Sequence, residues 1–227
     1  MKILITRFSS IGDIVLCSPI IRCLKMQLDA DIHFCTKKAY VDILSENPYL
    51  SKVHSLDNSW GEFIKALKKE RFDLVIDLHN NLRTKRLRTS LGFPKTYSFD
   101  KINLKKWLAV NLKLDVLPNV HIVDRYFETV QSLNVKNDGL GLEYHIPEKD
   151  EIEEEWIPES HKKEYVAFVI GAKFNTKKLP VNRMIELCDK INKPIILIGG
   201  KEDVENAAEI ENFFKKNESD SSFDKGL

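Results

Sequence analysis

Short apolar runs alternate with longer amphipathic stretches along this chain, and this alternation restricts its fold more than any other feature. The expected strands are residues 2–6, 32–35, 53–56, 72–77, 165–170 and 194–198, and the expected helices are residues 13–28, 59–69, 121–133, 180–189 and 203–214. Strands separated by helices of this length form parallel sheets with right-handed crossovers. The sequence therefore predicts an α/β fold with parallel sheets.

A charged segment divides this pattern into two parts. Residues 148–156 read "EKDEIEEEW" and are flanked by Pro147 and Pro158, which is typical of a solvated linker or a surface helix. We therefore predict a first lobe at 1–147, a linker at 148–160 and a second lobe at 161–227. The second lobe has only two expected strands, whereas a sheet that buries both faces usually has about five. We expect this second lobe to be incomplete.

Composition excludes several classes of function. The net charge of +1 disfavours a bulk electrostatic grip on nucleic acid. The four cysteines form no CxxC pair and have no metal-ligand spacing, as expected for reduced core thiols in a cytosolic protein. No run of 18 or more apolar residues occurs, and no acidic pair suggests a metal site. We predict a cytoplasmic protein without a bound metal.

Residues 6–13, "TRFSSIGD", follow the first expected strand. Ligands of open parallel sheets bind beyond the carboxyl ends of the strands, where this segment lies. The small residues Ser9, Ser10 and Gly12 allow the backbone to approach a ligand closely. Asp13 lies at or near a helix N-terminus, where an ionised carboxylate can orient a hydroxyl and accept its proton. The alternative is that Ser10 or Asp13 only caps the helix.

The segment "MKILITRFSSIGDIVLCSPIIRCLK" resembles the opening of glycosyltransferase family 9, the lipopolysaccharide heptosyltransferases. The resemblance continues in "FDLVIDLHNNLRTKRL" (72–87), "HIVDRYFETV" (121–130), "GAKFNTKKLP" (171–180) and "PIILIGGKEDVENAAEI" (194–210). It implies the GT-B architecture, in which two Rossmann-like lobes bind the acceptor and the nucleotide-sugar donor respectively. Two departures are evident: Leu179 stands where the family usually has Trp, and the family's later Asp-x-Gly-x-x-His segment has no match here.

The resemblance implies an inverting transfer of heptose from ADP-heptose to the inner core of lipopolysaccharide, with Asp13 as general base. The donor is a substrate, and no cofactor is implied. Thr176 and Lys177 are the residues expected to contact the donor diphosphate, and Asp203 to contact its ribose. Asp203 has an equally good alternative as a charge at a helix N-terminus.

On the acceptor side, the resemblance and the segment that follows the expected strand 72–77 indicate further residues. The candidates for acceptor binding are Ser9, Ser10, Gly12, His79, Asn80, Arg83 and Arg125. Arg125 either faces the acceptor or pairs with a neighbour. Residues 83–106 are locally basic, which fits either a solvated helix face or contact with an anionic membrane surface. We expect Ser9, Ser10, Gly12, Asp13, His79 and Arg83 to converge at one place.

Two alternatives remain open at this point. The chain could use another nucleotide-sugar donor, or it could be a truncated, non-catalytic fragment that binds glycan or nucleotide. The expected partners are a nucleotide sugar and the lipopolysaccharide acceptor, with peripheral contact at the inner face of the cytoplasmic membrane and no nucleic acid.

Overall fold

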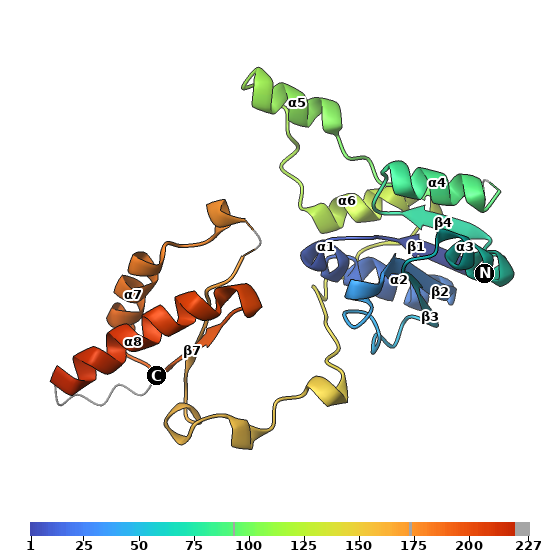
Figure 1. The fold of residues 1–227 in the computed structure, drawn as a ribbon. Coiled ribbons are helices and arrows are strands. Elements are labelled where there is room, and N and C mark those ends of the chain that lie inside the picture. The colour runs from blue at the N-terminus through green and yellow to red at the C-terminus, as the bar shows by residue number, and fades with distance from the viewer. Residues whose placement is uncertain (93, 173, 221–227) are drawn as a thin grey trace. The chain divides into compact units, whose positions relative to one another are not determined.

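The computed structural model describes residues 1–92, 94–172 and 174–220, which form two compact units, Met1–Glu151 and Ile152–Leu227 (Figure 1). Residue 173 and the last seven residues of the predicted second lobe lie outside the described residues. The boundary falls inside the predicted linker. That linker contains three short 3₁₀ turns, Glu148–Asp150, Glu154–Trp156 and Glu159–His161, in place of a surface helix.

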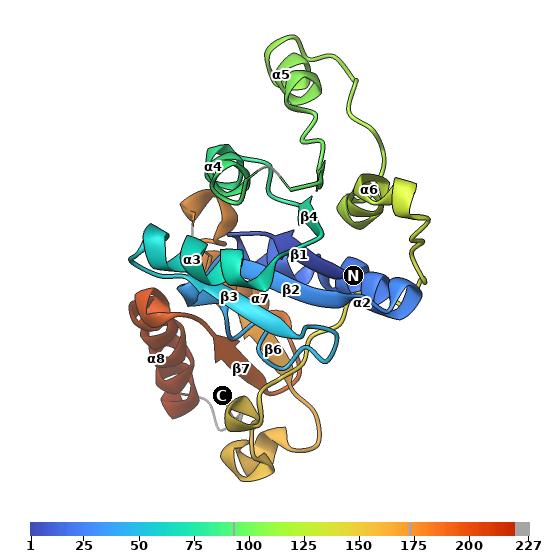
Figure 2. The ribbon, with the colours of Figure 1, turned by 90° about the vertical axis from the view of Figure 1, so that its right-hand side faces the viewer.

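The first unit contains a five-stranded parallel sheet in the order β3-β2-β1-β4-β5. Its strands are β1 (Lys2–Thr6), β2 (Asp31–Lys37), β3 (Lys52–Leu56), β4 (Leu74–Asp77) and β5 (Thr96–Ser98). Figure 2 shows β3, β2, β1 and β4 side by side. The central strand β1 pairs with both β2 and β4, so that Thr6 lies opposite both Cys35 and Asp77. The predicted parallel α/β fold is confirmed.

Two separate cores cover the two faces of this sheet. Ile3 and Ile5 belong to the core shared with α1 (Ile11–Val15), α2 (Ser18–Leu28) and α6 (Ile122–Thr129). Leu4 belongs to the opposite core, with α3 (Trp60–Glu70) and α4 (Leu82–Ser90). Alternate residues of β1 are thus buried on opposite faces, which explains why its sequence is apolar without alternation.

The region expected to be one helix over 13–28 is two helices, α1 and α2. Pro19 at the start of α2 has no N–H, and its ring would clash with the carbonyl of Val15, so a single helix cannot continue through it. The helix α1 therefore begins at Ile11, and Asp13 is its third residue. This short helix places the Asp13 carboxylate next to the loop that precedes it.

Three elements of the first unit were not expected from the sequence: α4, β5 and α5 (Asn103–Asn111). The helix α4, "LRTKRLRTS", lacks an apolar stripe, and only Thr84 and Leu87 are buried in it. Its start depends on a capping box in which Asn81 and Thr84 exchange hydrogen bonds of 2.9 and 3.0 Å. The strand β5 has three residues, too few for a periodic signal.

The second unit has a two-stranded parallel sheet in its described residues, formed by β6 (Val166–Val169) and β7 (Ile195–Ile198). Two helices, α7 (Val181–Lys190) and α8 (Val204–Asp220), pack with it. The core consists of Ile170, Met184, Cys188, Ile195, Ile210 and Phe214. Val169 and Ile198 remain 64% and 46% exposed. None of the helices in the described ranges is long and apolar enough to cross a membrane.

Candidate active site

Two loops leave the carboxyl edge of the first sheet next to each other. One follows β1 and leads into α1, and the other follows β4 and leads into α4. Because β1 and β4 pair directly, with Thr6 opposite Asp77, the two loops begin side by side. This edge is where ligands of open α/β sheets bind.

Arg7 connects the two loops. Its guanidinium lies 2.6 Å from Asp13 Oδ2 and donates to the carbonyl oxygens of Ser9, at 2.8 Å, and Leu78, at 2.6 Å. The Arg7 side chain is only 11% exposed. The backbone N–H of Phe8 adds a second connection by donating to His79 Nδ1 at 3.3 Å. The loops are therefore cross-linked before any ligand binds.

Asp13 is held through one of its two carboxylate oxygens. Oδ2 accepts hydrogen bonds from the Ser10 N–H at 3.1 Å and the Ser10 hydroxyl at 2.9 Å, in addition to the Arg7 pair. Partial burial alone would raise the pKa of Asp13, but the Ser10 N–H and the Arg7 guanidinium outweigh it and lower the pKa below its usual value. The carboxylate is thus ionised at neutral pH, and Oδ1 receives none of these three bonds.

The capping alternative raised by the sequence therefore applies to Asp13. With Ser10 it forms the capping box at the start of α1. The same carboxylate carries the Arg7 ion pair and leaves an oxygen available at the ligand edge. The capping contact of Asp13 is thus observed, and its role as a general base stays a prediction.

Asp77 holds the loop between β4 and α4 in place through hydrogen bonds of its carboxylate. It is fully buried, and its Oδ1 accepts from the Thr6 hydroxyl at 2.9 Å and from the N–H groups of His79 and Asn80 at 3.0 and 2.7 Å. Asn80 has a left-handed backbone with φ +42°, and its side-chain amide donates to the Phe99 carbonyl at 2.8 Å. The loop is thereby fixed to β1 on one side and to the end of β5 on the other.

His79 is buried at this edge, with 9% of its surface exposed. Burial, followed by the positive charges of Arg7 and Lys101, lowers the pKa of His79 to about 4. The ring is therefore neutral at pH 7. Because Nδ1 accepts the Phe8 N–H, we assign the proton to Nε2, which makes His79 a hydrogen-bond donor.

The two arginine candidates, Arg83 and Arg125, differ in their contacts. Arg83 is exposed on α4, and its guanidinium carbon lies 5.6 Å from the centre of the Phe8 ring. Arg125 donates to the Asp100 carbonyl at 2.5 Å and stacks on Phe99, so it pairs with a neighbouring segment, which was the second possibility for it.

The small residues of the first loop are also placed at this edge. Ser9 and Ser10 precede α1, and Gly12 is exposed, where an added Cβ would meet no atom within 4 Å beyond its chain neighbours and its own helix backbone. The backbone around Gly12 can therefore be approached from solvent. The structure brings Ser9, Ser10, Asp13, His79, Asn80 and Arg83 to two adjoining segments, the loop after β1 with the start of α1 and the loop after β4 with the start of α4.

Sequence reasoning missed two residues that build this site. Arg7 and Asp77 form its internal framework, yet neither was named as a site residue. The sequence signal that could have identified them was a charged residue at the carboxyl end of each of their strands, β1 and β4. Asp77 Oδ2 is buried and has no hydrogen-bond partner among the described residues, which is unusual for a carboxylate.

In the second unit, the candidate donor residues fall into two groups. Thr176 and Lys177 are exposed in the 3₁₀ turn Asn175–Lys177, between β6 and α7. The Lys177 ammonium lies 5.9 Å from the centre of the Phe174 ring. A cation and a hydroxyl in this turn remain accessible to a phosphate.

Asp203, which was expected to contact the donor ribose, is buried and bonded within its own unit. It is 2% exposed, and its carboxylate pairs with Lys178 at 2.5 Å and accepts from the Gly200 N–H at 2.9 Å. These two partners lower its pKa. A side chain at Gly171 would collide with this carboxylate. The geometry favours the role at a helix N-terminus, and it identifies Lys178 as a residue that sequence reasoning did not single out.

Comparisons with known proteins agree with this architecture. The family model described as glycosyltransferase family 9 (heptosyltransferase) matches residues 60–219. Lipopolysaccharide heptosyltransferase 1 from Campylobacter coli is 24% identical over 214 residues, which cover 85% of this chain and 61% of that protein. The chain therefore spans less than two thirds of the length of this curated relative.

Solved structures show the same fold at low sequence identity. The family 9 glycosyl transferase from Veillonella parvula has a TM-score of 0.71 at 19% identity, over 92% of this chain and 65% of that one. The Escherichia coli heptosyltransferase WaaC with ADP has a TM-score of 0.67 at 19% identity, over 92% of this chain and 71% of that one. Because the family model matches well over half of the residues, the chain belongs to glycosyltransferase family 9.

Proposed function

We propose that this chain is an inverting glycosyltransferase that transfers heptose from ADP-heptose to the inner core of lipopolysaccharide, with Asp13 as the general base. Family membership and the names of its relatives support the substrate class. The observation that carries the proposal is the Asp13 carboxylate, which is ionised and held through Oδ2 by Arg7 and Ser10. Its second oxygen is left for a substrate hydroxyl.

In the proposed reaction, Asp13 Oδ1 accepts the proton of the acceptor hydroxyl while that oxygen attacks the anomeric carbon of the donor. The bond from this carbon to the diphosphate breaks, and ADP leaves from the opposite face of the sugar. A carboxylate with a lowered pKa is a weak base, so it takes the proton late, after the carbon has gained positive character. General-base catalysis of this kind contributes about 10²- to 10⁴-fold in rate.

The residues around Asp13 would bind the acceptor. His79 offers an N–H donor at Nε2, since its other ring nitrogen is occupied by Phe8. Asn80 uses its amide N–H on Phe99, which leaves its side-chain oxygen for a sugar hydroxyl. Arg83 supplies an exposed positive charge for the carboxylates and phosphates of a lipopolysaccharide core.

Lys177 and Thr176 would bind the donor diphosphate. An exposed lysine beside a hydroxyl in a turn before a helix suits a phosphate group, which would also meet backbone N–H groups. Positive charge for the leaving group then comes from a side chain, and the proposed transfer requires no metal and no cofactor besides the nucleotide sugar.

We further propose peripheral contact with the inner face of the cytoplasmic membrane. Figure 1 shows α5 apart from the sheet of its own unit. This helix and the segment after it expose Trp107, Val110, Leu112, Leu114, Leu117 and Val120. From residue 83 to residue 113 the chain has nine Lys or Arg and only Asp100 as an acid. Apolar side chains beside cations match an anionic lipid surface.

The test is incubation of the chain with ADP-heptose and a heptose-deficient lipopolysaccharide, with ADP release and acceptor mass as readouts. Other nucleotide sugars serve as donor controls, and Asp13→Asn serves as the inactive control. Transfer from ADP-heptose alone supports the proposal. Transfer from a different donor would keep the enzyme and replace the sugar, whereas binding without any transfer would support a non-catalytic fragment.

A further inference from the structure

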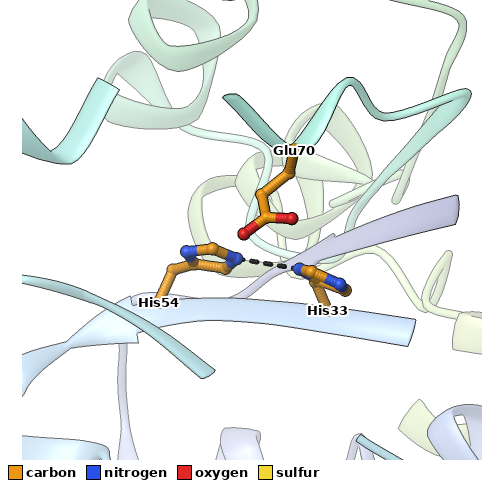
Figure 3. Close-up of side chains that lie close together, drawn as sticks. All are labelled: His33, His54 and Glu70. Atoms are coloured by element: carbon orange, nitrogen blue, oxygen red, sulfur yellow. Dashed lines mark hydrogen bonds between the residues drawn. The ribbon is translucent and has the colours of Figure 1, made fainter. Parts of the chain in front are cut away.

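A group of three potential metal ligands lies away from the Asp13 site. His33 in β2, His54 in β3 and Glu70 at the end of α3 point toward one another (Figure 3). In the described part of the chain, the nitrogen and oxygen ligand atoms of these three residues all lie within 4.8 Å of one another. Asp13 follows the carboxyl end of β1, whereas Glu70 is tied to Lys2, the first residue of the same strand. The cluster therefore plays no part in the proposed transfer.

The two histidines are already in place. His33 Nδ1 lies 2.9 Å from His54 Nε2, and both residues are buried, with 3% and 5% of their surfaces exposed. Phe72 packs edge-on against both rings. A tetrahedral site with metal–nitrogen bonds of about 2.0–2.1 Å needs the two nitrogens about 3.3 Å apart. The two nitrogens therefore have to separate by a few tenths of an ångström, and both rings have to turn so that their lone pairs meet at the ion.

A carboxylate orients one of the rings. His33 Nε2 lies 3.3 Å from Asp31 Oδ1, so this nitrogen donates its proton to Asp31 and the lone pair of Nδ1 faces His54. A histidine whose second nitrogen donates to a carboxylate is the usual arrangement behind a metal ligand.

Glu70 is ionised and currently shared by two lysines. Its Oε1 lies 2.7 Å from Lys52 Nζ, and its Oε2 lies 3.0 Å from Lys2 Nζ. These lysines lower the pKa of Glu70 to about 2. The Lys52 side chain is 55% exposed, so its ammonium can move into solvent and release Oε1 while Lys2 keeps Oε2. Lys52 is thus the competitor that a metal ion has to displace.

We propose that His33 Nδ1, His54 Nε2 and Glu70 Oε1 form a binding site for a divalent transition-metal ion of the zinc type, with water as the fourth ligand. Two imidazoles and one carboxylate are a donor set that zinc accepts. Binding moves the remaining proton of His54 to its Nδ1 and frees the Lys52 ammonium. The ion would tie β2, β3 and α3 together and stabilise the first unit.

The experiment uses the complete chain, without an affinity tag, after removal of metals by chelation. Titration with Zn²⁺ is expected to show one ion per chain and a rise in melting temperature. Substitution with Co²⁺ is expected to give the intense visible absorption of a tetrahedral site. His54→Gln and Glu70→Gln should each weaken binding at least about tenfold, and Asp31→Asn by about 10- to 100-fold.

Lys52→Met is the decisive variant because it acts in the opposite direction. Removing the competing ammonium should tighten Zn²⁺ binding, whereas binding at unrelated surface groups would not respond. His145→Gln is the matched control, since it removes a histidine–carboxylate pair of the same unit, with Glu143, outside the cluster. The proposal is overturned if Co²⁺ gives no tetrahedral spectrum, if His54→Gln binds Zn²⁺ as the parent does, or if Lys52→Met does not bind it more tightly. The cluster would then be a hydrogen-bonded histidine pair that serves packing alone.

Discussion

The two units build the same kind of parallel sheet to different extents. In the first unit, five strands carry a core on each face, and β1 is buried from Ile3 to Thr6. In the described part of the second unit, two strands carry a single core, and Val169 and Ile198 stay exposed. Beside this sheet is a hollow of about 670 Å³ whose lining includes Trp156, Tyr165 and Ile196.

This difference extends to the candidate sites. The carboxyl edge of the first sheet is cross-linked by Arg7 and Asp77, which fix the positions of Asp13 and of the His79 backbone. The turn with Thr176 and Lys177 in the second unit is exposed. Under the proposed function, precise positioning would belong to the first unit and electrostatic capture of a phosphate to the second. Four predictions test this division.

The largest effect is expected from Asp13→Asn. The amide cannot accept the hydroxyl proton, so kcat should fall about 10²- to 10⁴-fold, with little change in the KM for ADP-heptose. Loss of the ion pair between Asp13 and Arg7, whose side chain is 11% exposed, should cost about 1–3 kcal/mol of stability. Lys177→Met is the counterpart in the second unit and should mainly raise the KM for the donor. Steady-state kinetics and thermal melts of both variants provide the measurement. Near-normal turnover with a large fall in melting temperature would reduce Asp13 to a helix cap.

The second prediction compares the two cores directly. Ile5 and Ile210 are both fully buried, one in each unit. Ile5→Ala should destabilise the first unit by about 2–5 kcal/mol, and Ile210→Ala should cost less, because a core under a single sheet face can relax around the cavity. Chemical denaturation, monitored by hydrogen exchange, should show that each substitution lowers the unfolding free energy of its own unit only. One common transition shifted by both variants would mean that the units unfold together.

The third prediction concerns acid sensitivity of the first unit. The pKa of His79 is about 4 in the folded chain and about 6.5 when unfolded, so the unfolded state binds more protons between these values. Stability from this group is complete above pH 6.5 and is lost as the pH falls toward 4, by about 1–3 kcal/mol. His79→Gln should flatten this part of the pH dependence of unfolding relative to the unsubstituted chain. An equal slope in the variant and the unsubstituted chain would contradict the assignment.

The smallest effect is expected from Arg83→Ala. Arg86 stacks on Trp60 and Arg88 bonds to Ser98, whereas the contact of Arg83 is with Phe8 of the first loop. Loss of one cation near an anionic acceptor should weaken binding by about 1 kcal/mol at low salt and reduce the salt dependence. Lys65→Ala, an exposed lysine of α3, is the control. Identical acceptor affinity of wild type and Arg83→Ala at low and high salt would assign Arg83 to solvated surface.

Much of the fold could be predicted from local patterns. The apolar runs located β1, β4, β6 and β7 within one or two residues. For β1 and β4 the reason is that strands buried on both faces require continuous apolar sequence. The Ser59–Glu62 pair marked the start of α3, where the Ser59 hydroxyl accepts the Glu62 N–H at 3.3 Å. The helix α4 was not predicted because it lacks an apolar stripe, and the strand β5 was not predicted because it is too short.

The sequence by itself determined the fold class, since it follows from the order of buried strands, and it located the polar residues that end those strands. Only the tertiary structure decided what those residues do. Arg7 acquires its role from Leu78, and Asp77 from Thr6, each 71 positions away. His33 and His54 meet because β2 and β3 pair in register. Such contacts depend on strand pairing and register, which no local spacing of residues records.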